Sequence, residues 1–199
     1  MKSLIHKTFI CLMLAAGVTF SAAAQQVSIL PDESQLWIEG SSNVNKFQCI
    51  AKRYRSDIET TGTVDTLAET GLEVEIDIFV RSFDCGRSRM NRDLQDALKV
   101  QQFEAIHFKY LDTKNVVYDS ESNTYTLTVE GILSVAGTER TIIFDLDGHL
   151  IDATTIKATG SSKIEMRNFN IEPPTAMMGL IKVDELLTVH FDLTAKFED

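Results

Sequence analysis

The sequence is poor in several residue types, and each shortage excludes a class of protein. Three prolines and ten glycines in 199 residues are too few for a collagen-like chain or for a disordered chain rich in these residues. Basic residues are also few, 19 Lys and Arg against 29 Asp and Glu, for a net charge of -10. Binding to nucleic acid, or electrostatic docking on an anionic membrane, needs a concentrated basic face that no Lys/Arg cluster supplies here. We expect a globular protein whose partner is a protein, a small molecule or a lipid.

Catalytic motifs are missing as well. There is no G-x-S-x-G, no glycine-rich phosphate loop and no H-E-x-x-H. Carboxylates such as Asp145 and Asp147 alternate with apolar residues, which is typical of the solvated face of a sheet rather than of a general acid/base pair. The histidines are scattered without the spacing of metal ligands: His6, His107, His149 and His190. The sequence therefore predicts a protein that is not an enzyme and that binds neither a metal nor a cofactor.

The first residues have the pattern of a secretory signal peptide. Lys2 and Lys7 precede an apolar run, Phe9–Phe20, and the small residues Ser21–Ala24 follow in an A-x-A arrangement. The alternative, a transmembrane anchor, needs about 20 apolar residues, and this run is shorter. We expect cleavage after Ala24, export to the periplasm or secretion, and one mature domain (residues 25–199) without a membrane span.

Two cysteines remain after the predicted cleavage. Cys49 and Cys85 lie in the mature chain, whereas Cys11 lies in the signal peptide. The two are 36 positions apart, which excludes the C-x-x-C motif of a thioredoxin-type redox site. In an oxidising compartment, two such cysteines favour a structural bond. We predict one disulfide between them.

Apolar and polar residues alternate along most of the mature chain, which indicates an all-β fold. Leu72–Val80 places apolar residues on one face and mainly acidic residues on the other. Similar runs recur along the chain: Tyr125–Val135, Ile142–Leu146, Ile156–Met166 and Leu187–Phe197, with shorter ones at Leu36–Glu39, Val44–Ala51, Asp57–Val64 and Ala105–Leu111. Short connections favour antiparallel pairing. About eight such strands form a sandwich or a barrel, and their length favours a closed antiparallel barrel without edges.

One segment, Arg89–Val100, departs from this alternation. Its apolar residues fall on one stripe of a helix: Met90, Leu94, Ala97 and Leu98. Ser88 is a candidate N-cap. We expect one short amphipathic helix that lies across a sheet or at one end of the barrel. The stretch Asn170–Leu180 contains two prolines and is expected to be a loop.

Four segments carry a resemblance to a known family. They are WIEGSS (Trp37–Ser42), FEAIHF (Phe103–Phe108), a Y-x-L-x-x-x-G-x-L-x-V-x-G-x-x-R pattern (Tyr125–Arg140) and F-N-I-x-P-P-T…M-G-L-I-K-V-D-E-L-L-T-V (Phe169–Val189). Together they resemble the YceI-like polyisoprenoid-binding family over essentially the whole mature chain. The resemblance implies a lipocalin-like barrel whose apolar interior holds an isoprenoid or similar long-chain lipid, in a periplasmic or secreted protein without known catalysis.

The candidate ligand-binding residues are the inward-facing apolar side chains of this barrel and of its helix. They are Leu72, Val74, Ile76, Ile78, Met90, Leu94, Leu98, Leu127, Val129, Leu133, Ile142, Phe144, Leu146, Val189 and Phe191. Arg89 and Arg92 are candidates for binding a phosphate or quinone headgroup, and Met177 and Met178 are candidates for the edge of the mouth.

Small residues on the apolar faces bear on whether the interior is open. These are Gly131, Ala158, Gly160 and Ser162, which would either leave room for a tunnel or mark strained corners of the barrel. Two functions follow from these alternatives. An open interior predicts an exported lipid carrier or buffer, and a filled interior predicts a stress-related or protein-interaction module without a lipid ligand.

Overall fold

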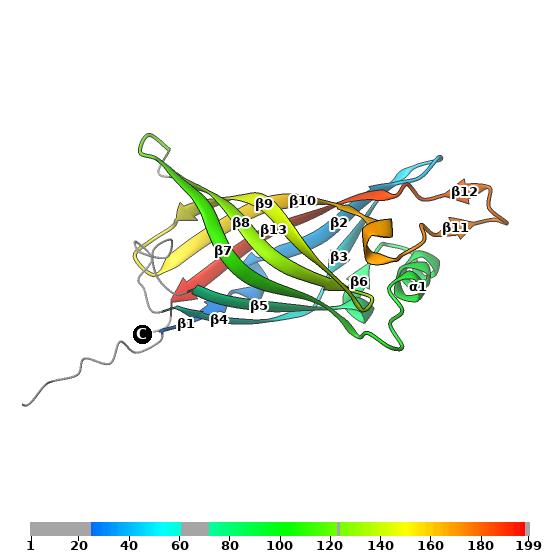
Figure 1. Ribbon diagram of the computed structural model, residues 1–199, viewed down its shortest axis with the longest axis horizontal. Coiled ribbons are helices and arrows are strands. Elements are labelled where there is room, and N and C mark those ends of the chain that lie inside the picture. Colours follow the sequence, from blue (N-terminus) through cyan, green and yellow to red (C-terminus); the bar gives the residue numbers. More distant parts are fainter. Residues whose placement is uncertain (1–24, 61–71, 123, 198–199) are drawn as a thin grey trace, which may run out of the picture.

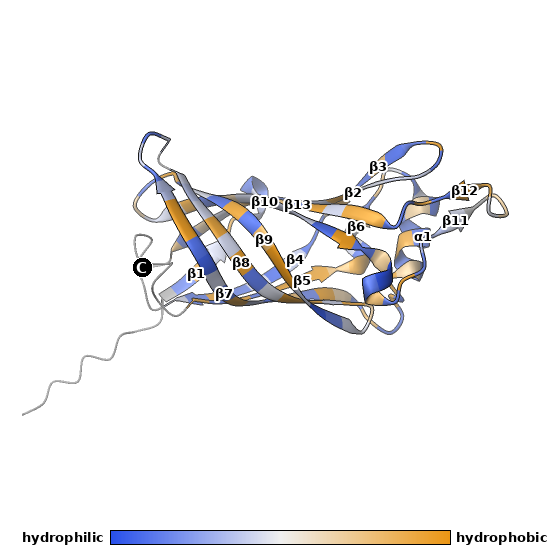
Figure 2. Ribbon diagram, turned by 45° about the horizontal axis from the view of Figure 1, so that its top comes forward, coloured by the Kyte–Doolittle hydropathy of each residue, from blue (hydrophilic) through white to orange (hydrophobic). Residues whose placement is uncertain are grey.

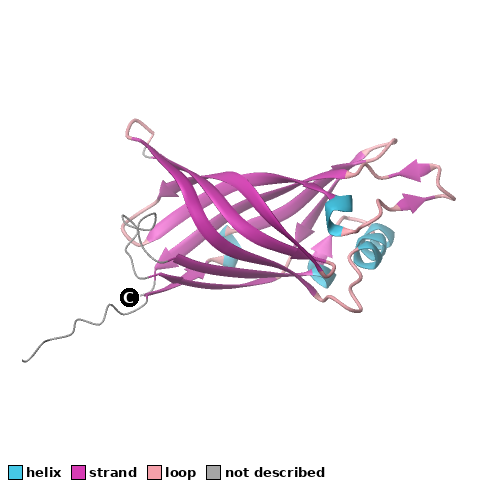
Figure 3. Ribbon diagram, in the orientation of Figure 1, coloured by secondary structure: helices cyan, strands magenta, loops and turns pink. Residues whose placement is uncertain are grey.

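Strands make up most of the computed structural model, which describes residues 25–60, 72–122 and 124–197 (Figures 1 and 3). The predicted signal peptide and the end of the strand predicted to reach Val64 lie outside these residues. The strands are β1 (Gln25–Ile29), β2 (Gln35–Ser41), β3 (Lys46–Ala51), β4 (Tyr54–Thr60), β5 (Leu72–Phe79), β6 (Phe83–Asp84), β7 (Ala105–Asp119), β8 (Thr124–Val135), β9 (Thr138–Leu150), β10 (Thr155–Glu165), β11 (Thr175–Ala176), β12 (Ile181–Lys182) and β13 (Leu186–Phe197). The helices are α1 (Ser88–Ala97) and the short 3₁₀ turns η1 (Pro31–Glu33), η3 (Val80–Ser82) and η4 (Met166–Phe169).

Eight antiparallel strands close into a barrel, as the alternation predicts. Around the ring they follow the order β1, β4, β5, β7, β8, β9, β10 and β13, and β13 pairs with β1 to close it. The ladder between β10 and β13 runs through eleven residue pairs, from Thr155↔Lys196 to Glu165↔Leu186. Closure pairs every strand of the ring on both sides, which leaves it without a free edge.

One side of the wall is creased. There, β2, β3 and β6 continue the ring beyond β1, β4 and β5, after interruptions at Pro31–Glu33, Lys52–Arg53 and Val80–Ser82. The second and third interruptions lie side by side, because the Lys52 amide donates to the Ser82 carbonyl (3.1 Å) and the Phe79 amide donates to the Arg53 carbonyl (3.2 Å). Pro31–Glu33 and Lys52–Arg53 line the same surface pocket. We call these three segments the crease. They interrupt three neighbouring strands of the wall.

The two faces of the wall differ in polarity, since apolar and polar residues alternate along β8 and β9 (Figure 2). On the outer face, Thr126 Oγ1 donates to Asp147 (2.8 Å) and Thr128 Oγ1 donates to Asp145 (2.7 Å). These are cross-strand neighbours in the β8–β9 ladder. The acidic residues of this strand therefore belong to the solvated wall, as the sequence predicts, and the apolar residues between them face inward.

Helix α1 lies at one end of the barrel (Figure 1) and departs slightly from its predicted bounds. Arg87, in extended conformation, is the N-cap residue and Ser88 is the first helical residue, so the predicted Ser88 cap is wrong. The helix ends at Ala97 rather than at Val100, because Lys99 adopts a left-handed backbone with φ 53°. None of the helices in the described part of the chain is long and apolar enough to cross a membrane.

The predicted disulfide is confirmed. Cys49 on β3 is bonded to Cys85, which precedes α1, across a sequence separation of 36. Leu94, Ala97 and Leu98 pack against the main apolar core around it. The disulfide therefore ties the start of the helix to the barrel wall.

Candidate functional site

A cavity of about 660 Å³ occupies the barrel interior. All fifteen apolar residues that the sequence proposes as lining do line it: Leu72, Val74, Ile76, Ile78, Met90, Leu94, Leu98, Leu127, Val129, Leu133, Ile142, Phe144, Leu146, Val189 and Phe191. They come from β5, β8, β9, β13 and the helix end. The period-two faces therefore meet around one space, because every strand of a barrel turns alternate residues to the lumen. Whether these residues contact a ligand stays a prediction.

Three phenylalanine rings form part of the cavity wall. Phe144 lies edge-on to Phe108, with ring centroids 5.9 Å apart, and edge-on to Phe191, with centroids 5.5 Å apart. Such edge-to-face pairs are a favourable arrangement of aromatic rings. They make this part of the wall well packed.

Two glycines make room for these rings rather than for a ligand. A Cβ on Gly160 would lie 2.5 Å from Cζ of Phe191, and a Cβ on Gly131 would lie 2.4 Å from Cε2 of Phe108. The interpretation that these two glycines leave space for a tunnel is therefore wrong. Ala158 and Ser162, the other two small residues, do line the cavity.

Two polar residues inside the cavity are absent from the sequence-based candidates. Tyr110 and Thr113 both line it, and their hydroxyl oxygens are 3.0 Å apart. Strand β7 has register shifts between Tyr110 and Asp112 and between Thr113 and Asn115. Each bulge inserts an extra residue and shifts the inward phase of the strand. Simple alternation from Ile106, Phe108 and Tyr110, which line the cavity, therefore misses the inward position of Thr113.

The two arginines predicted to bind a headgroup differ in their position relative to the cavity. Arg89 lines the cavity and its Nε lies 3.8 Å from the Asp93 carboxylate, whereas Arg92 does not line it. Each residue turns an α-helix by about 100°, so Arg92 lies on the face opposite Met90 and Leu94. Arg87, just before the helix, is the second arginine of the lining. The proposed role of Arg92 therefore lacks support from its position.

The two methionines of the predicted mouth also differ. Met177 lines the cavity, and Met178 does not. The segment Asn170–Leu180 is mostly loop, as predicted, but it contains the short strand β11, which pairs with β12. This hairpin projects beyond the barrel at the end where α1 lies (Figure 1).

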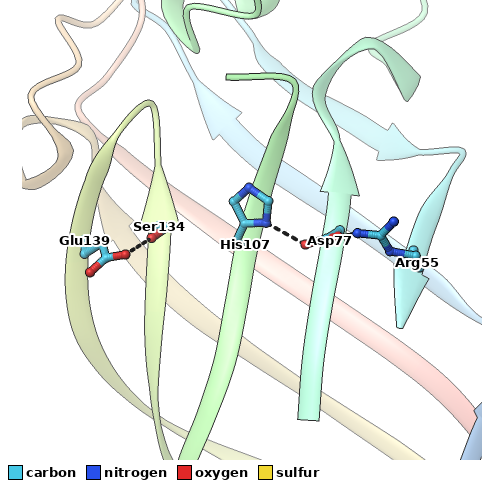
Figure 4. A network of polar contacts seen from close by, with 5 residues as sticks. All are labelled: Arg55, Asp77, His107, Ser134 and Glu139. Carbon is cyan, nitrogen blue, oxygen red and sulfur yellow. Dashed lines mark hydrogen bonds and ion pairs between the residues drawn. The ribbon is translucent and has the colours of Figure 1, made fainter. Parts of the chain in front are cut away.

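The outer wall carries a row of polar residues from five strands, shown in Figure 4. His107 Nδ1 lies 2.5 Å from Asp77 Oδ1, and Arg55 forms an ion pair with the other oxygen of Asp77. Burial raises the pKa of Asp77, but hydrogen bonds from His107 and Arg55 outweigh it, so the pKa lies below its ordinary value. Ser134 Oγ donates to Glu139 (2.9 Å). Because the Ser134 hydroxyl donates its hydrogen bond to Glu139 and not to His107, these residues are not arranged as a nucleophile–base pair.

The other histidines that the structure describes, His149 and His190, lie on β9 and β13. Among the residues that the structure describes, there is no group of three or more His, Cys, Asp or Glu side chains that could hold a metal ion. His190 stacks on Trp37 with ring centroids 5.0 Å apart and an interplanar angle of 7°. This contact joins β13 to β2, on which Trp37 lies.

The cavity favours an apolar ligand of slender shape. Its lining is aliphatic and aromatic apart from a few polar groups, so binding there gains free energy mainly by removing apolar surface from water. Strand β13 has 12 residues, which at about 3.3 Å per residue and a tilt near 40° gives a wall about 30 Å high. This long wall surrounds the cavity, and residues of helix α1 line it at one end.

Comparisons with known proteins agree with this architecture. The YceI-like domain model matches residues 28–195. BcnA of Burkholderia cenocepacia has a TM-score of 0.64 at 17% identity, covering 84% of this chain and 99% of BcnA. A polyisoprenoid binding domain from Saccharophagus degradans has a TM-score of 0.64 at 13% identity, covering 85% of this chain and 97% of that domain.

A third solved structure, the YceI protein of Campylobacter jejuni, has a TM-score of 0.55 at 18% identity and covers 76% of this chain and 85% of that protein. None of the curated proteins matches the sequence. At these identities the solved structures show a shared fold, and the domain model covers nearly all of the described chain. The resemblance predicted from the sequence is therefore confirmed: the chain belongs to the YceI-like family.

Proposed function

We propose that the protein holds one isoprenoid or similar long-chain lipid in the barrel interior, as a carrier or buffer rather than as an enzyme. The observation that carries the proposal is the continuous apolar lining of a cavity of about 660 Å³. Cavities of this size are typical of small-molecule sites, which span about 300–1,000 Å³. The similarity in fold to the polyisoprenoid binding domain of Saccharophagus degradans supports the same ligand class.

The cavity volume sets the size of the ligand. If each carbon-bearing group occupies about the volume of a water molecule in the liquid, about 30 Å³, a cavity of about 660 Å³ holds about 20 groups. Each buried methylene contributes about 0.8 kcal/mol. A chain of about four isoprene units therefore binds tightly without directional contacts, even after the loss of conformational entropy.

A polar headgroup has partners at the helix end. Arg87 and Arg89 line the cavity there, and Asp93 lies beside Arg89. Arginine binds phosphate and carboxylate oxygens in a bidentate manner. We place an anionic or quinone headgroup at these arginines and the apolar tail along β5, β8, β9 and β13.

Export is part of the proposal. Residues 1–24 have the pattern of a signal peptide, and the Cys49–Cys85 disulfide is of the kind that persists in oxidising compartments. A protein that is secreted or exported to the periplasm passes through the pathway that a signal peptide serves and reaches an oxidising compartment in which the disulfide persists. Long-chain lipids are insoluble in such aqueous compartments, and an enclosing barrel would keep them dispersed.

The test compares two phenylalanine substitutions on β10. Ser162 lines the cavity at the level of Val189, whereas its neighbour Ser161 is exposed on the outer wall. Protein purified without detergent should release lipid into organic solvent for mass spectrometry. Ser162→Phe should lower the bound amount and the affinity for labelled isoprenoids at least tenfold, and Ser161→Phe should leave both unchanged.

Two results would contradict the proposal. One is wild-type protein that carries no extractable lipid and does not bind labelled isoprenoids at micromolar concentration. The other is equal lipid binding by the two variants, with both folded as judged by circular dichroism. Either result would favour a barrel that acts as a stress-related or protein-interaction module.

A further inference from the structure

Four exposed apolar side chains gather at the end of the barrel that carries α1. They lie on the β2–β3 loop and on the β11–β12 hairpin, which project beyond the barrel in Figure 1. Their exposed fractions are 62% for Val44, 61% for Met177, 107% for Met178 and 72% for Leu180. We call these four residues the apolar tip.

Hydrogen bonds hold the two loops of the tip together. The Asn43 amide donates to the Lys182 carbonyl (3.1 Å), and the Lys182 amide donates to Asn43 Oδ1 (2.9 Å). Asn43 Nδ2 also donates to the Leu180 carbonyl (2.9 Å). Nearby, the Asp184 amide donates to the Ser41 carbonyl (2.8 Å). The tip is thus one built surface formed by segments about 140 positions apart in the sequence.

The backbone of the hairpin is strained where it presents the methionines. Met177 and Met178 have φ of 50° and 55°, and Gly179 follows with φ 87°. The left-handed region is unfavourable for residues with a Cβ. Met178 is as exposed as in an isolated extended chain, so its side chain gains no packing in return. Strained, exposed residues of this kind point to a role outside the stability of the fold.

The tip is continuous with the mouth of the cavity. Met177 lines the cavity together with Pro174, Ile181 and Val183 from the same hairpin. An apolar chain that leaves the interior here meets apolar side chains before it meets water. A surface that must exchange such a chain with a lipid phase has this property.

The shape of the tip fits a bilayer better than a protein partner. Stable protein interfaces bury about 800 Å² on each partner, contributed by about 20–30 residues. The apolar tip consists of four residues on two narrow loops. Inserted into the acyl-chain region of a bilayer, each of them is covered by lipid without any need for complementary shape.

We propose that the apolar tip inserts into the acyl-chain region of a lipid bilayer and thereby places the cavity mouth at the membrane surface. The proposal rests on the proposed function, because it adds the route by which the ligand enters and leaves. The contact is apolar rather than electrostatic, since the chain carries a net charge of -10. Binding therefore extends to neutral bilayers and resists salt.

The test measures co-flotation with neutral phosphatidylcholine vesicles. The protein is purified after export, so that the predicted signal peptide does not contribute to binding. We expect Met178→Asp combined with Leu180→Asp to lower the vesicle-bound fraction at equilibrium at least tenfold, since each buried apolar side chain contributes about a factor of ten or more. Wild-type binding should be unchanged in about 0.5 M NaCl.

Val117 provides the matched control. It is an apolar residue with an exposed fraction of 63%, two positions before the end of β7. The turn from β7 to β8 lies at the opposite end of the barrel from α1 (Figure 1). Val117→Asp adds the same single charge as Leu180→Asp alone, at a similarly exposed position, and should change vesicle binding less than twofold, whereas Leu180→Asp alone should lower it several-fold. Absence of wild-type flotation, or equal losses in the tip and control variants, would overturn the proposal. So would a tip variant that floats normally but loses a defined protein partner.

Lipid extraction separates this inference from the proposed function. Extracted wild-type protein that carries lipid, combined with vesicle binding that ignores the tip, would overturn the docking surface and leave the lipid-binding function standing. Tip-dependent flotation of a protein whose interior yields no lipid would overturn the proposed function and retain the docking surface.

Discussion

Removal of the Cys49–Cys85 disulfide should destabilise the barrel strongly without abolishing its fold. The double substitution Cys49→Ala with Cys85→Ala opens a covalent loop whose ends are 36 positions apart. The two cysteines join β3 to the segment just before α1, so the bond restricts the part of the unfolded chain that contains β4, β5 and β6. The native contacts of the helix with the core remain in the variant.

The magnitude follows from chain entropy. A closed loop of 36 positions reduces the entropy of the unfolded chain by an amount equivalent to about 4 kcal/mol at 25 °C. Cys49 is only 2% exposed, and the loss of its buried sulfur adds about 1 kcal/mol. Most domains have a free energy of unfolding of about 5–15 kcal/mol. We therefore expect a variant that is folded but much less stable.

Urea unfolding followed by circular dichroism measures this difference. The free energy of unfolding should fall by about 4–5 kcal/mol, and the slope m should rise, since an uncrosslinked chain exposes more surface when it unfolds. A reducing agent should lower the stability of the wild type toward that of the variant and leave the variant unchanged. A loss below about 1 kcal/mol in both experiments would refute the reasoning from unfolded-state entropy.

Three further predictions concern single residues. Asp77→Asn should lower the free energy of unfolding by about 1 kcal/mol or less near neutral pH, as expected for an exposed ion pair. The difference from the wild type should vanish as the pH falls through the lowered pKa of Asp77, because the wild-type carboxylate is then protonated. Urea titrations at several pH values measure this. Gly160→Ala should destabilise the barrel by about 1–3 kcal/mol, because its Cβ would lie 2.5 Å from Phe191 Cζ, and adding Phe191→Leu should recover part of this loss in a double-mutant cycle. Met178→Gly removes a side chain from a left-handed backbone with φ 55°, so its melting temperature should stay equal to or rise above that of the wild type. A marked fall in that temperature would mean that Met178 packs in solution.

The cavity lining was predictable because it depends on a local pattern. In β5, β8, β9 and β13 the residues alternate without interruption, so the inward face can be identified from the sequence alone. Phe144 and Val189 are examples, since both lie on such runs and both line the cavity. The same argument predicts the outer position of Asp145, which accepts a hydrogen bond from Thr128 on the solvated wall.

The errors arise where the outcome depends on distant parts of the chain. A residue without a Cβ is needed at Gly160 because the ring of Phe191, 31 positions later, packs against its Cα on the neighbouring strand. Thr113 faces inward because of bulges whose positions no simple alternation reveals. The choice of Arg87 over Arg92 at the mouth depends on how the helix is rotated against the barrel, and packing of Leu94 and Leu98 on the core determines that rotation.

Because of the crease, we expect the two sides of the barrel wall to differ in their resistance to bending. On one side, β8, β9, β10 and β13 run for 11 to 13 residues without a break, and their continuous strand pairing resists bending. On the other, three neighbouring strands turn at Pro31–Glu33, Lys52–Arg53 and Val80–Ser82, where ladder pairing is replaced by a few single hydrogen bonds. Bending concentrates where hydrogen bonds between strands are fewest, so we expect the lumen to widen at the crease while the continuous strands keep their pairing. We therefore expect the lumen to widen by flexing at the crease rather than by breaking the ring of strands.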